Sequence, residues 1–494
     1  ALSVSAERVQ WRMSSGMTVT RVRSECGAAP LLAKKGSDSV RILAGDEPTG
    51  DRSVYTSEGI AGYVIDAPPA AGFVPWIAVT ATDERNDEFD YNAHPSGSVV
   101  GNNLAADPAS DFAVGILDSG AGAHLVGYYN SLKLGITGSY LTDNFIEISG
   151  VDGSVWVGVS QPIGLFVDGL GAVSPGGLYL SGMVGEYNVS VAVGDVPPPD
   201  TNDLPTAIGP PLSVYFNVFI DNTLQHTVDL SGEQYTGPDI RFYDYDDFNT
   251  PDYSIDVPLE LRPAGGVQVS YFPDTQDFTD TSPSTPSTIV GNLSQSLFFV
   301  HSVDAYEGGY SAVDKDGFML DTGAQVSVVG SHVGARLALD PESPDFTVDI
   351  TGATGGSIQA PGFYLDSLQI PALGQWLEYT NVPVILLDIA SPEGGTLDGI
   401  IGMNLFVDYN MVIRGGGLEM GVNPELSLAL IKSPDIAPPE GDGVVDYYDL
   451  ARLVSLWLTS SADTGWSPEC DLAPLEGDGV VNLLDLAVLI NNWD

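Results

Sequence analysis

The sequence predicts a mainly β protein that ends in a small, all-α tail. Three observations support this fold class. From about residue 111 to 220 the chain consists of short alternating strands rich in Val, Gly and Tyr, with almost no helical periodicity. An Asp in a glycine-containing turn between two apolar runs occurs there and again in the second half of the chain. Helical periodicity begins only in segment 434–494, where one face carries Leu450, Leu453, Val454 and Trp457.

The two Asp turns share one local pattern. Phe318–Gly330 reads F-M-L-D-T-G-A-Q-V-S-V-V-G, and Val114–Val126 reads V-G-I-L-D-S-G-A-G-A-H-L-V. Each pattern places an Asp at the end of an apolar strand, in a tight turn that Gly makes possible. Backbone amides and the neighbouring hydroxyl are then expected to orient the carboxylate. The residues concerned are Asp118, Ser119, Asp321 and Thr322.

Two such turns facing each other would bring two carboxyl groups together. Carboxylates about 3 Å apart cannot both ionise at low cost, so they share a proton. One then serves as a base and the other as an acid. The turns therefore predict chemistry in which a water molecule is activated.

Each Asp turn is followed by a second repeated segment. Leu397–Ile413 reads L-D-G-I-I-G-M-N-L-F-V-D-Y-N-M-V-I, and Leu204–Ile220 reads L-P-T-A-I-G-P-P-L-S-V-Y-F-N-V-F-I. The Asp turns lie 203 residues apart (321 minus 118), and these segments lie 193 apart (401 minus 208). Motif order and approximate spacing repeat together, which is hard to obtain by chance.

In these four segments the chain resembles the pepsin and retropepsin superfamily of aspartic proteases. That superfamily uses a hydrophobic-hydrophobic-Asp-Thr/Ser-Gly turn once per lobe and threads a hydrophobic-hydrophobic-Gly segment behind each turn. The resemblance covers roughly residues 110–430. It implies a bilobal, pepsin-like double β-barrel and a secreted endopeptidase that hydrolyses peptide or protein substrates. The catalytic residues that it implies are Asp118, Asp321, Ser119 and Thr322.

A catalytically silent protein is the alternative, because such a turn can hold a core after catalysis is lost. His124 stands where the second half has Ser327, and Pro205 replaces the acidic residue usual in the superfamily. Gly150–Trp156 is the candidate for the substrate-covering flap by spacing, but no Tyr can be assigned to it. The alternative function is a pepsin-like structural protein of an extracellular filament, envelope or adhesive assembly.

The histidines give no sign of a metal enzyme. The five lie at positions 94, 124, 226, 301 and 332 and form no ligand-spaced pair, which argues against zinc catalysis. We expect His124 to be a packing residue.

The tail carries its own internal repeat. D-I-A-P-P-E-G-D-G-V-V-D-Y-Y-D-L-A-R-L begins at Asp435, and a similar sequence begins 36 residues later at Asp471. Alternating acidic residues, a Gly for a sharp turn and an Asp opening an amphipathic helix suit Ca²⁺, which takes oxygen ligands. The repeat resembles a dockerin, a paired calcium module that binds a cohesin on a partner. The resemblance implies two Ca²⁺ sites, with candidate ligands Asp435, Glu440, Asp442, Asp446, Asp449, Asp471, Glu476, Asp478, Asn482 and Asp485.

The start of each calcium loop departs from the dockerin pattern. Pro438 and Pro474 occupy the usual first-ligand position, so we expect Asp435 and Asp471 to reach in across a longer loop. An acidic helix N-cap without metal is the alternative. The expected partner of the tail is a cohesin-like or surface protein, and self-assembly stays open.

Charge and apolar content exclude several other function classes. The chain has 17 Lys and Arg against 66 Asp and Glu, a net charge of -49, which repels nucleic acid phosphates and anionic membranes. Its apolar runs are shorter than the roughly 18 residues that span a bilayer. Cys26 and Cys470 define no disulfide framework and could pair with each other, pair elsewhere or stay free. Because the chain begins at Ala1, we expect a mature secreted protein, extracellular or at the cell surface.

The predicted domain order has five parts. Residues 1–110 form an N-terminal β-rich extension or propiece, 111–220 lobe one, 221–295 an inter-lobe sheet with a Ser/Thr/Pro linker, 296–433 lobe two and 434–494 the dockerin-like tail. Residues 1–52 hold eight of the 17 basic residues and six acids, a net charge of +2. This segment could lie across the cleft as a propiece, or form a β-region such as Ser37–Leu43 packed on lobe one.

Overall fold

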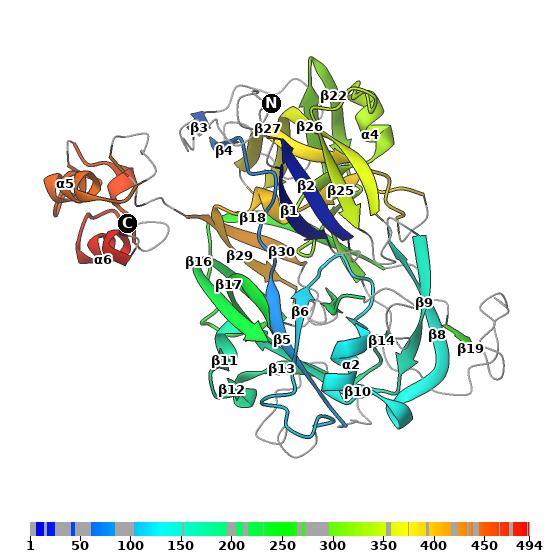
Figure 1. Cartoon of the computed structure of the whole chain (residues 1–494). Helices are drawn as coiled ribbons and strands as arrows, with labels where there is room; N and C mark the ends of the chain where they lie inside the picture. Colours follow the sequence, from blue (N-terminus) through cyan, green and yellow to red (C-terminus); the bar gives the residue numbers. More distant parts are fainter. Residues whose placement is uncertain are drawn as a thin grey trace, which may run out of the picture.

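The computed structural model shows two large β-sheets and a two-helix tail (Figure 1). The mainly β class predicted from the sequence is confirmed. No helix within the described residues is long and apolar enough to cross a membrane. The structure describes residues 6–13, 17–24, 41–44, 61–83, 103–150, 153–194, 204–210, 216–230, 232–263, 269–271, 296–351, 357–373, 375–391, 395–415, 423–431, 434, 436–437, 444–463, 465–473, 478–491 and 493.

The first sheet has ten strands in the order β13-β10-β5-β6-β15-β7-β14-β9-β8-β19. The first Asp turn follows its strand β6. The strands are β5 (Trp76–Thr82), β6 (Ala113–Leu117), β7 (Leu125–Val126), β8 (Leu141–Gly150), β9 (Gly153–Ser160), β10 (Ile163–Gly169), β13 (Val184–Val189), β14 (Ala192–Val193), β15 (Ala207–Ile208) and β19 (Val269–Tyr271). A separate two-stranded sheet contains β11 (Val173–Ser174) and β12 (Gly177–Leu178).

Eighteen strands of the second sheet lie within the described residues, and the second Asp turn follows its strand β23. The strands are β1 (Ala6–Met13), β2 (Met17–Ser24), β3 (Arg41–Ala44), β4 (Ala61–Asp66), β16 (Phe216–Leu230), β17 (Glu233–Asp244), β18 (Ile255–Pro263), β20 (Ser296–Val300), β21 (Val303–Glu307), β22 (Tyr310–Lys315), β23 (Phe318–Leu320), β24 (Ser327–Val329), β25 (Phe346–Thr351), β26 (Ser357–Ala372), β27 (Gln375–Leu386), β28 (Gly399–Ile401), β29 (Tyr409–Arg414) and β30 (Glu425–Leu430).

The helices of the described residues are short. The α-helices are α2 (Tyr128–Leu134), α4 (Ser331–Arg336), α5 (Tyr447–Ser455) and α6 (Leu483–Asn491). The 3₁₀ helices are η1 (Gly138–Tyr140), η2 (Leu170–Ala172), η3 (Leu180–Gly182), η4 (Met403–Leu405) and η6 (Pro468–Cys470). Helices α2 and α4 each follow the short strand after an Asp turn, and each is preceded by a Gly, Gly127 or Gly330.

The same strand order occurs in both sheets. In the first sheet it is β6-β15-β7-β14-β9-β8-β19, and in the second it is β23-β28-β24-β27-β26-β25-β2. Each step along the two series has the same relative strand direction, parallel or antiparallel. The repeat seen in the sequence is therefore a repeat of strand pairing as well.

Strands of the predicted N-terminal extension belong to both sheets. β5, which lies within the range 1–110, pairs with β6 and β10 in the first sheet. β3 pairs with β4, and β4 pairs with β27 in the second sheet. The described part of the region expected to pack on lobe one therefore joins the other half. The reason is that strand partners are non-local and a local apolar pattern does not identify them.

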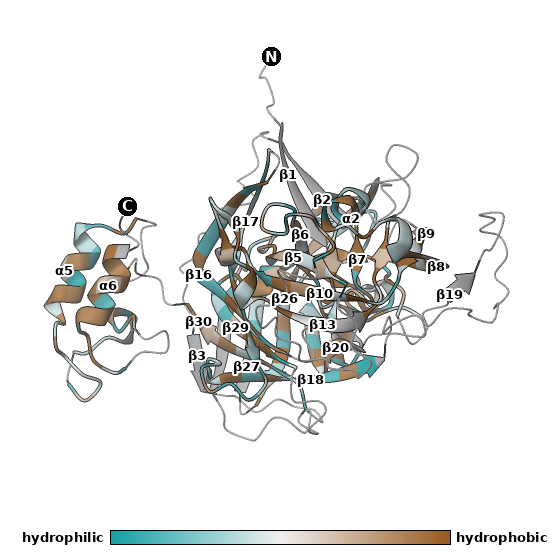
Figure 2. Ribbon diagram, turned by 90° about the horizontal axis from the view of Figure 1, so that it is seen from below, coloured by the Kyte–Doolittle hydropathy of each residue, from teal (hydrophilic) through white to brown (hydrophobic). Residues whose placement is uncertain are grey.

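The halves are joined where the expected inter-lobe sheet lies. β16 pairs with β29, and β18 pairs with both β30 and β20. The apolar faces of these strands enter one continuous buried cluster, and apolar residues run through the interior of the ribbon in Figure 2. Its largest fully buried side chains include Tyr379, Tyr409, Phe216 and Phe298.

The hairpin of β16 and β17 contacts both halves. Near the second half, the Asn222 amide donates to the carbonyls of Phe406 (3.1 Å) and Tyr409 (2.7 Å). Near the first half, the ring of Tyr235 packs edge-on against Trp76, with 5.0 Å between centroids. The hairpin belongs to the second sheet and also contacts β5 of the first sheet, so it links the two sheets.

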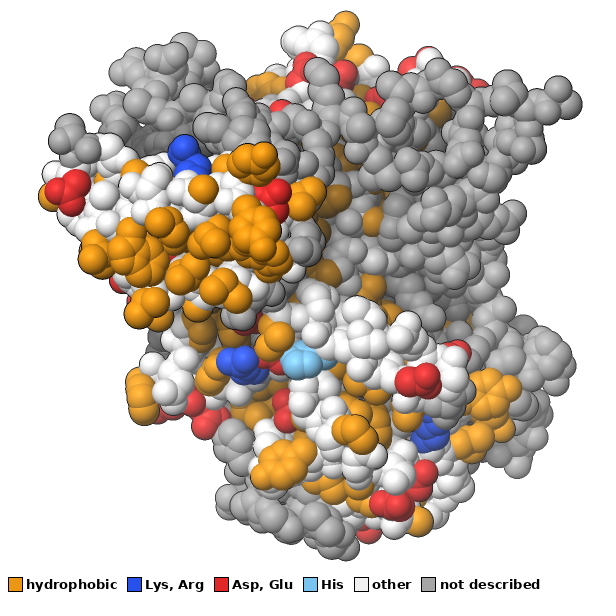
Figure 3. Space-filling model, turned by 60° about the vertical axis from the view of Figure 1, so that its left-hand side comes forward, with side chains coloured by type: hydrophobic (Ala, Val, Ile, Leu, Met, Phe, Trp, Pro, Cys, Tyr) orange, Lys and Arg blue, Asp and Glu red, His pale blue; other side chains and the backbone are white. Residues whose placement is uncertain are grey.

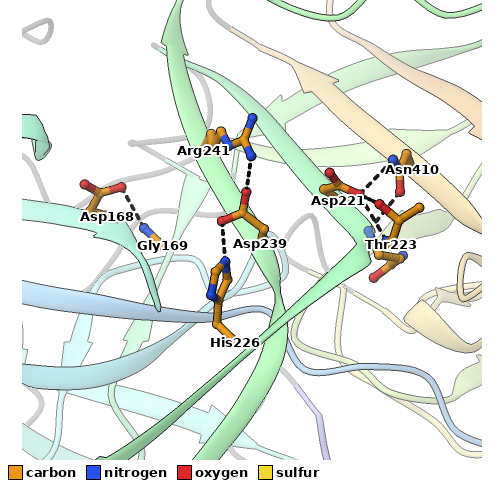
Figure 4. A network of polar contacts seen from close by, with 9 residues as sticks. Asp168, Gly169, Asp221, Thr223, His226, Asp239, Arg241 and Asn410 are labelled. Carbon is orange, nitrogen blue, oxygen red and sulfur yellow. Dashed lines mark hydrogen bonds and ion pairs between the residues drawn. The ribbon is translucent and has the colours of Figure 1, made fainter. Parts of the chain in front are cut away.

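A titratable cluster lies where this hairpin meets η2 and the end of β10 (Figure 4). Asp239 forms an ion pair with Arg241 (2.6 Å) and a hydrogen bond with Nε2 of His226 (2.9 Å). Asp168 accepts the N–H of Gly169 at 2.8 Å. Burial, with a smaller contribution from the charge of Asp239, raises the pKa of Asp168 to about 6, against the opposing effect of the Gly169 N–H.

An Asp168→Asn variant is expected to gain stability over the wild type as the pH rises. The folded-state pKa lies above the unfolded value, so the wild type is favoured below about pH 4 and loses stability as the pH passes about 6. At about 1.4 kcal/mol per pKa unit, the gain levels off at roughly 2 to 3 kcal/mol. Urea unfolding at pH 4 and pH 7.5 measures it, with Asp229→Asn at the exposed end of the same hairpin as control. An equal difference at both pH values would contradict the assignment.

Candidate active site

Each Asp turn follows a buried strand, and backbone N–H groups of the turn donate to the carboxylate of its own Asp. Strands β6 and β23 are buried along their whole length. Oδ1 of Asp118 accepts the N–H of Gly120 at 3.0 Å. Oδ1 of Asp321 accepts the N–H groups of Gly323 (2.9 Å) and Ala324 (3.1 Å). These bonds orient both carboxylates, as expected from the glycine-containing sequences.

The two glycine segments lie directly beside the turns. β15 runs parallel to β6, and β28 runs parallel to β23. The N–H of Asp118 donates to the carbonyl of Ile208 at 2.9 Å, and the N–H of Asp321 donates to that of Ile401 at 3.1 Å. The backbone of each Asp is therefore held by the segment that the sequence repeats with it.

The two turns are bonded to each other reciprocally. The N–H of Ser119 donates to Oγ1 of Thr322 (3.0 Å), and the N–H of Thr322 donates to Oγ of Ser119 (2.9 Å). The Thr322 hydroxyl donates to the carbonyl of Leu117 (2.7 Å), and the Ser119 hydroxyl donates to that of Leu320 (2.8 Å). All four bonds are buried, so they fix the turns of the two halves against each other.

Asp118 and Asp321 meet at this contact. Both side chains are 0% exposed. A Cβ placed on Gly120 would lie 2.6 Å from Cγ of Asp321, so the first turn touches the second carboxyl group. Burial first, and then repulsion by Asp321 and a hydrogen bond with it, raise the pKa of Asp118 well above its usual value. The N–H groups of Gly120 and Ala121 oppose this rise. A pair of this kind holds one proton over a range of pH.

A Thr322→Val variant is expected to lose about 2 to 4 kcal/mol of stability. Val has nearly the same shape, but it leaves the buried N–H of Ser119 and the buried carbonyl of Leu117 without this partner, and each such loss costs about 1 to 3 kcal/mol. Denaturant unfolding measures the change. Thr227→Val is the control, because its hydroxyl bonds to Thr236 on the exposed part of β16. Equal changes in the two variants would show that the buried hydroxyl contributes no special stability.

The remaining residues singled out in the first half lie around this turn. His124 is 1% exposed, and its Nδ1 accepts the N–H of Gly209 at 3.0 Å. Gly150–Trp156, the candidate flap, falls on the connection of the β8–β9 hairpin, with 151–152 outside the described residues. Pro205 comes two residues before β15.

Two contacts in the second half were not identified from the sequence. Oδ1 of Asn404 accepts the N–H (2.9 Å) and the hydroxyl (2.8 Å) of Ser327. Gln325 and Gly72 exchange two hydrogen bonds, of 2.8 and 2.9 Å, which bring the segment before β5 against the second turn. Asn404 could have been found from the sequence, because it lies within the repeated segment Leu397–Ile413. The segment around Gly72 carries no repeated pattern that would have revealed its contact.

Some of the residues predicted as calcium ligands in the second repeat of the tail bond to each other and to the backbone. The Asp471 carboxylate accepts the N–H groups of Asp478 (3.1 Å) and Gly479 (2.8 Å). Oδ2 of Asp478 accepts from the Asn482 amide at 2.9 Å. The predicted ligands that lie outside the described residues are Asp435, Glu440, Asp442 and Glu476.

Asp449 and Asp485 anchor backbone groups. Both are fully buried. Asp449 accepts the N–H groups of Ile436 (2.6 Å), Ala437 (2.7 Å) and Asp446 (2.7 Å), and Asp446 caps α5. Asp485 accepts the corresponding N–H groups of Ala473 (2.7 Å) and Asn482 (2.6 Å). Among the described residues no three of His, Cys, Asp or Glu form a group that could hold a metal ion. These residues supply oxygen donors of the type that calcium takes, but not a complete coordination shell by themselves.

The tail also presents an apolar face. Tyr447 and Tyr448 at the start of α5 are 76% and 72% exposed, and Leu483 and Leu484 at the equivalent positions of α6 are 70% and 55% exposed. Figure 3 shows hydrophobic side chains gathered on the face of the molecule that this view turns forward. Cys470 is a buried free thiol, and Cys26 lies outside the described residues.

Comparison with known proteins agrees with the second half of the site. The family model for aspartyl protease matches residues 311–405, which include the Asp321 turn, β28 and η4. This region of the chain is therefore aspartic protease-like. No curated protein matches the chain.

Proposed function

We propose that this protein is an aspartic endopeptidase with a bilobal, pepsin-like fold, tethered through a dockerin-like tail. The observation that carries the proposal is the reciprocal bonding of Ser119 and Thr322, which places two buried carboxyl groups together. The aspartyl protease match at 311–405 and the same strand order in the first half support it. Secretion, and action outside the cell, are part of the proposal.

The proposed reaction is hydrolysis of a peptide bond by water held between Asp118 and Asp321. The ionised carboxylate takes a proton as the water oxygen bonds to the peptide carbon, and the protonated carboxyl donates its proton to the carbonyl oxygen. The resulting diol collapses as the C–N bond breaks and the amine leaves with a proton.

Acid is the expected working condition. The raised pKa of Asp118 keeps this carboxyl protonated to higher pH than an ordinary Asp, and activity falls as the pH rises through that value. Stability follows the same direction, because the contribution of this group is present below its unfolded pKa of about 4 and is lost as the pH passes the folded value.

The test is cleavage of an unfolded protein substrate in mild acid. We expect peptide products that pepstatin suppresses and that are absent with Asp321→Asn. Cleavage that is insensitive to pepstatin and to that substitution would refute the proposal. Failure to cleave, together with polymers visible by electron microscopy, would instead favour the catalytically silent structural protein.

The tail is proposed to bind calcium and to dock on a cohesin-like partner. The reach of Asp471 to Asp478 and Gly479 supports the calcium proposal, since it closes the loop that the repeat predicts. The apolar pairs at the starts of α5 and α6 support docking, because large exposed apolar patches mark interaction sites.

Calcium is expected to slow hydrogen exchange of residues 478–491 in the full chain. A ligand that binds only the folded state adds about 2.7 kcal/mol when present at about 100 times its Kd. Asp478→Asn should reduce this protection, while Asp229→Asn, an exposed carboxylate of β16 that accepts the N–H of Gly232, should leave it unchanged. Identical exchange in calcium and in chelator would rule out the site.

A further inference from the structure

The residue six positions after each Asp occupies an equivalent place in the two halves. These residues are His124 (118 plus 6) and Ser327 (321 plus 6). Both are 1% exposed, and both lie where the strand after the turn begins. Oγ of Ser327 accepts the N–H of Gly402 at 3.1 Å, and Nδ1 of His124 accepts the N–H of Gly209 at 3.0 Å. Two different side chains therefore accept the backbone N–H of the equivalent glycine in each half.

The donor belongs to the peptide unit that holds the catalytic turn. In the first half, the carbonyl of Ile208 accepts the N–H of Asp118, and the N–H of the same peptide unit, on Gly209, donates to His124. Fixing the N–H of a planar peptide also fixes the direction of its carbonyl. The orientation of His124 thus reaches the backbone of Asp118 through one rigid unit.

Close packing keeps this peptide unit near the turn in both halves. A Cβ on Gly209 would lie 2.5 Å from the carbonyl oxygen of Ala121. A Cβ on Gly402 would lie 2.7 Å from the backbone of Val326. Small rotations of the peptide are therefore transmitted to the Asp turn.

We infer that His124 is a positioning residue for Asp118, whose unprotonated Nδ1 takes the part that the Ser327 hydroxyl takes for Asp321. To accept an N–H, Nδ1 must carry a lone pair, so the ring is neutral with its proton on Nε2. In the second half, Asn404 supports Ser327 through its hydroxyl and backbone N–H. In the sequence of the first half, the position corresponding to Asn404 is Pro211, which has no side-chain amide. The imidazole of His124 instead accepts the N–H of Gly209 directly.

Three substitutions of His124 distinguish a role as hydrogen-bond acceptor for Gly209 from a role in packing alone. The side-chain oxygen of Asn lies close to where Nδ1 lies, whereas the polar atoms of Gln lie nearer to Nε2. Leu offers no acceptor. We expect His124→Leu and His124→Gln to lower kcat on the peptide substrate about 10- to 100-fold with KM within about 2-fold, because a small displacement of a catalytic group costs this much. His124→Asn should retain most of the activity.

Amide hydrogen exchange tests the inference without relying on catalysis. The N–H groups of Gly209 and Asp118 should exchange at least about tenfold faster in His124→Leu and His124→Gln than in the wild type, and His124→Asn should restore slow exchange. Ser327→Ala should speed exchange at Gly402 and Asp321 instead. The ¹⁵N shifts of His124 should show the Nε2–H tautomer.

The inference rests on the proposed function only for its activity measurement, so the two can fail separately. A wild-type protein that cleaves nothing defeats the proposed function, while the exchange results still decide the role of His124. If His124→Asn is as impaired and as fast in exchange as His124→Leu, or if the proton lies on Nδ1, the positioning role is wrong.

Discussion

Replacing Asp321 with Asn is expected to reduce peptidase activity by at least about 10³-fold while the protein stays folded. The substitution removes the group that shares a proton with Asp118, and the pair can then no longer supply both an acid and a base. The amide oxygen of Asn can still accept the N–H groups of Gly323 and Ala324, so the turn keeps these two hydrogen bonds.

The stability of this variant provides a second measurement. Repulsion by Asp321 helps to raise the pKa of Asp118, and a neutral Asn removes that repulsion. The loss of stability between acid and neutral pH should therefore be smaller in the variant than in the wild type. Mass spectrometry of cleavage products and denaturant unfolding at several pH values measure the two effects.

A matched control lies five residues earlier. Asp316 has a 59% exposed side chain and accepts the N–H of Ser302, a bond that Asn can keep. Asp316→Asn should leave activity and its pH dependence unchanged. Full activity of Asp321→Asn would mean that the carboxyl pair does not perform the reaction.

Gly120→Ala is expected to lower activity by about 10²-fold or more and to destabilise the protein by about 1 to 3 kcal/mol. The new methyl group would lie 2.6 Å from Cγ and Oδ2 of Asp321, both inside a fully buried side chain. Overpacking of a well-packed interior typically costs this much stability, and displacement of a reacting group by about 1 Å costs this much rate.

The control for this prediction is Gly176→Ala. The nearest atom to a Cβ on Gly176 is Oγ of Ser174, at 3.6 Å, which is an ordinary contact. This variant should keep wild-type kcat, and its stability should change by less than about 0.5 kcal/mol. If Gly120→Ala matched it in both measurements, the two turns would not be in the contact described here.

The Asp turns and the segments beside them could be predicted from the sequence because their requirements are local. Gly120, Gly209 and Gly402 each meet another backbone or carboxyl group at a distance that excludes a side chain, and such positions are visible as glycines in a repeated pattern. Duplication then indicated which two turns belong together. The reciprocal bonds of Ser119 and Thr322 depend on residue types that the sequence also displays.

Strand partners could not be predicted in the same way. β4 and β5 are separated by nine residues (67–75), yet they enter different sheets. β5 reads W-I-A-V-T-A-T and is buried from its second residue onward, and a short, mostly apolar strand of this kind fits beside many strands equally well. The role of His124 was missed for a related reason. The sequence showed that His124 stands at the position equivalent to Ser327. It did not show that His124 accepts the N–H of Gly209, which lies 85 residues further along the chain.

The pairing of β2 with β25 bears on any form of the protein that lacks its N-terminal segment. β2 covers the outer side of β25, as β19 covers β8 in the first half. Loss of residues 1–52 would leave a row of unpaired N–H and C=O groups on β25, and such an edge invites pairing with another molecule. A truncated protein would then dimerise or aggregate through this strand, so a change in its activity would not by itself show that residues 1–52 act as a propiece.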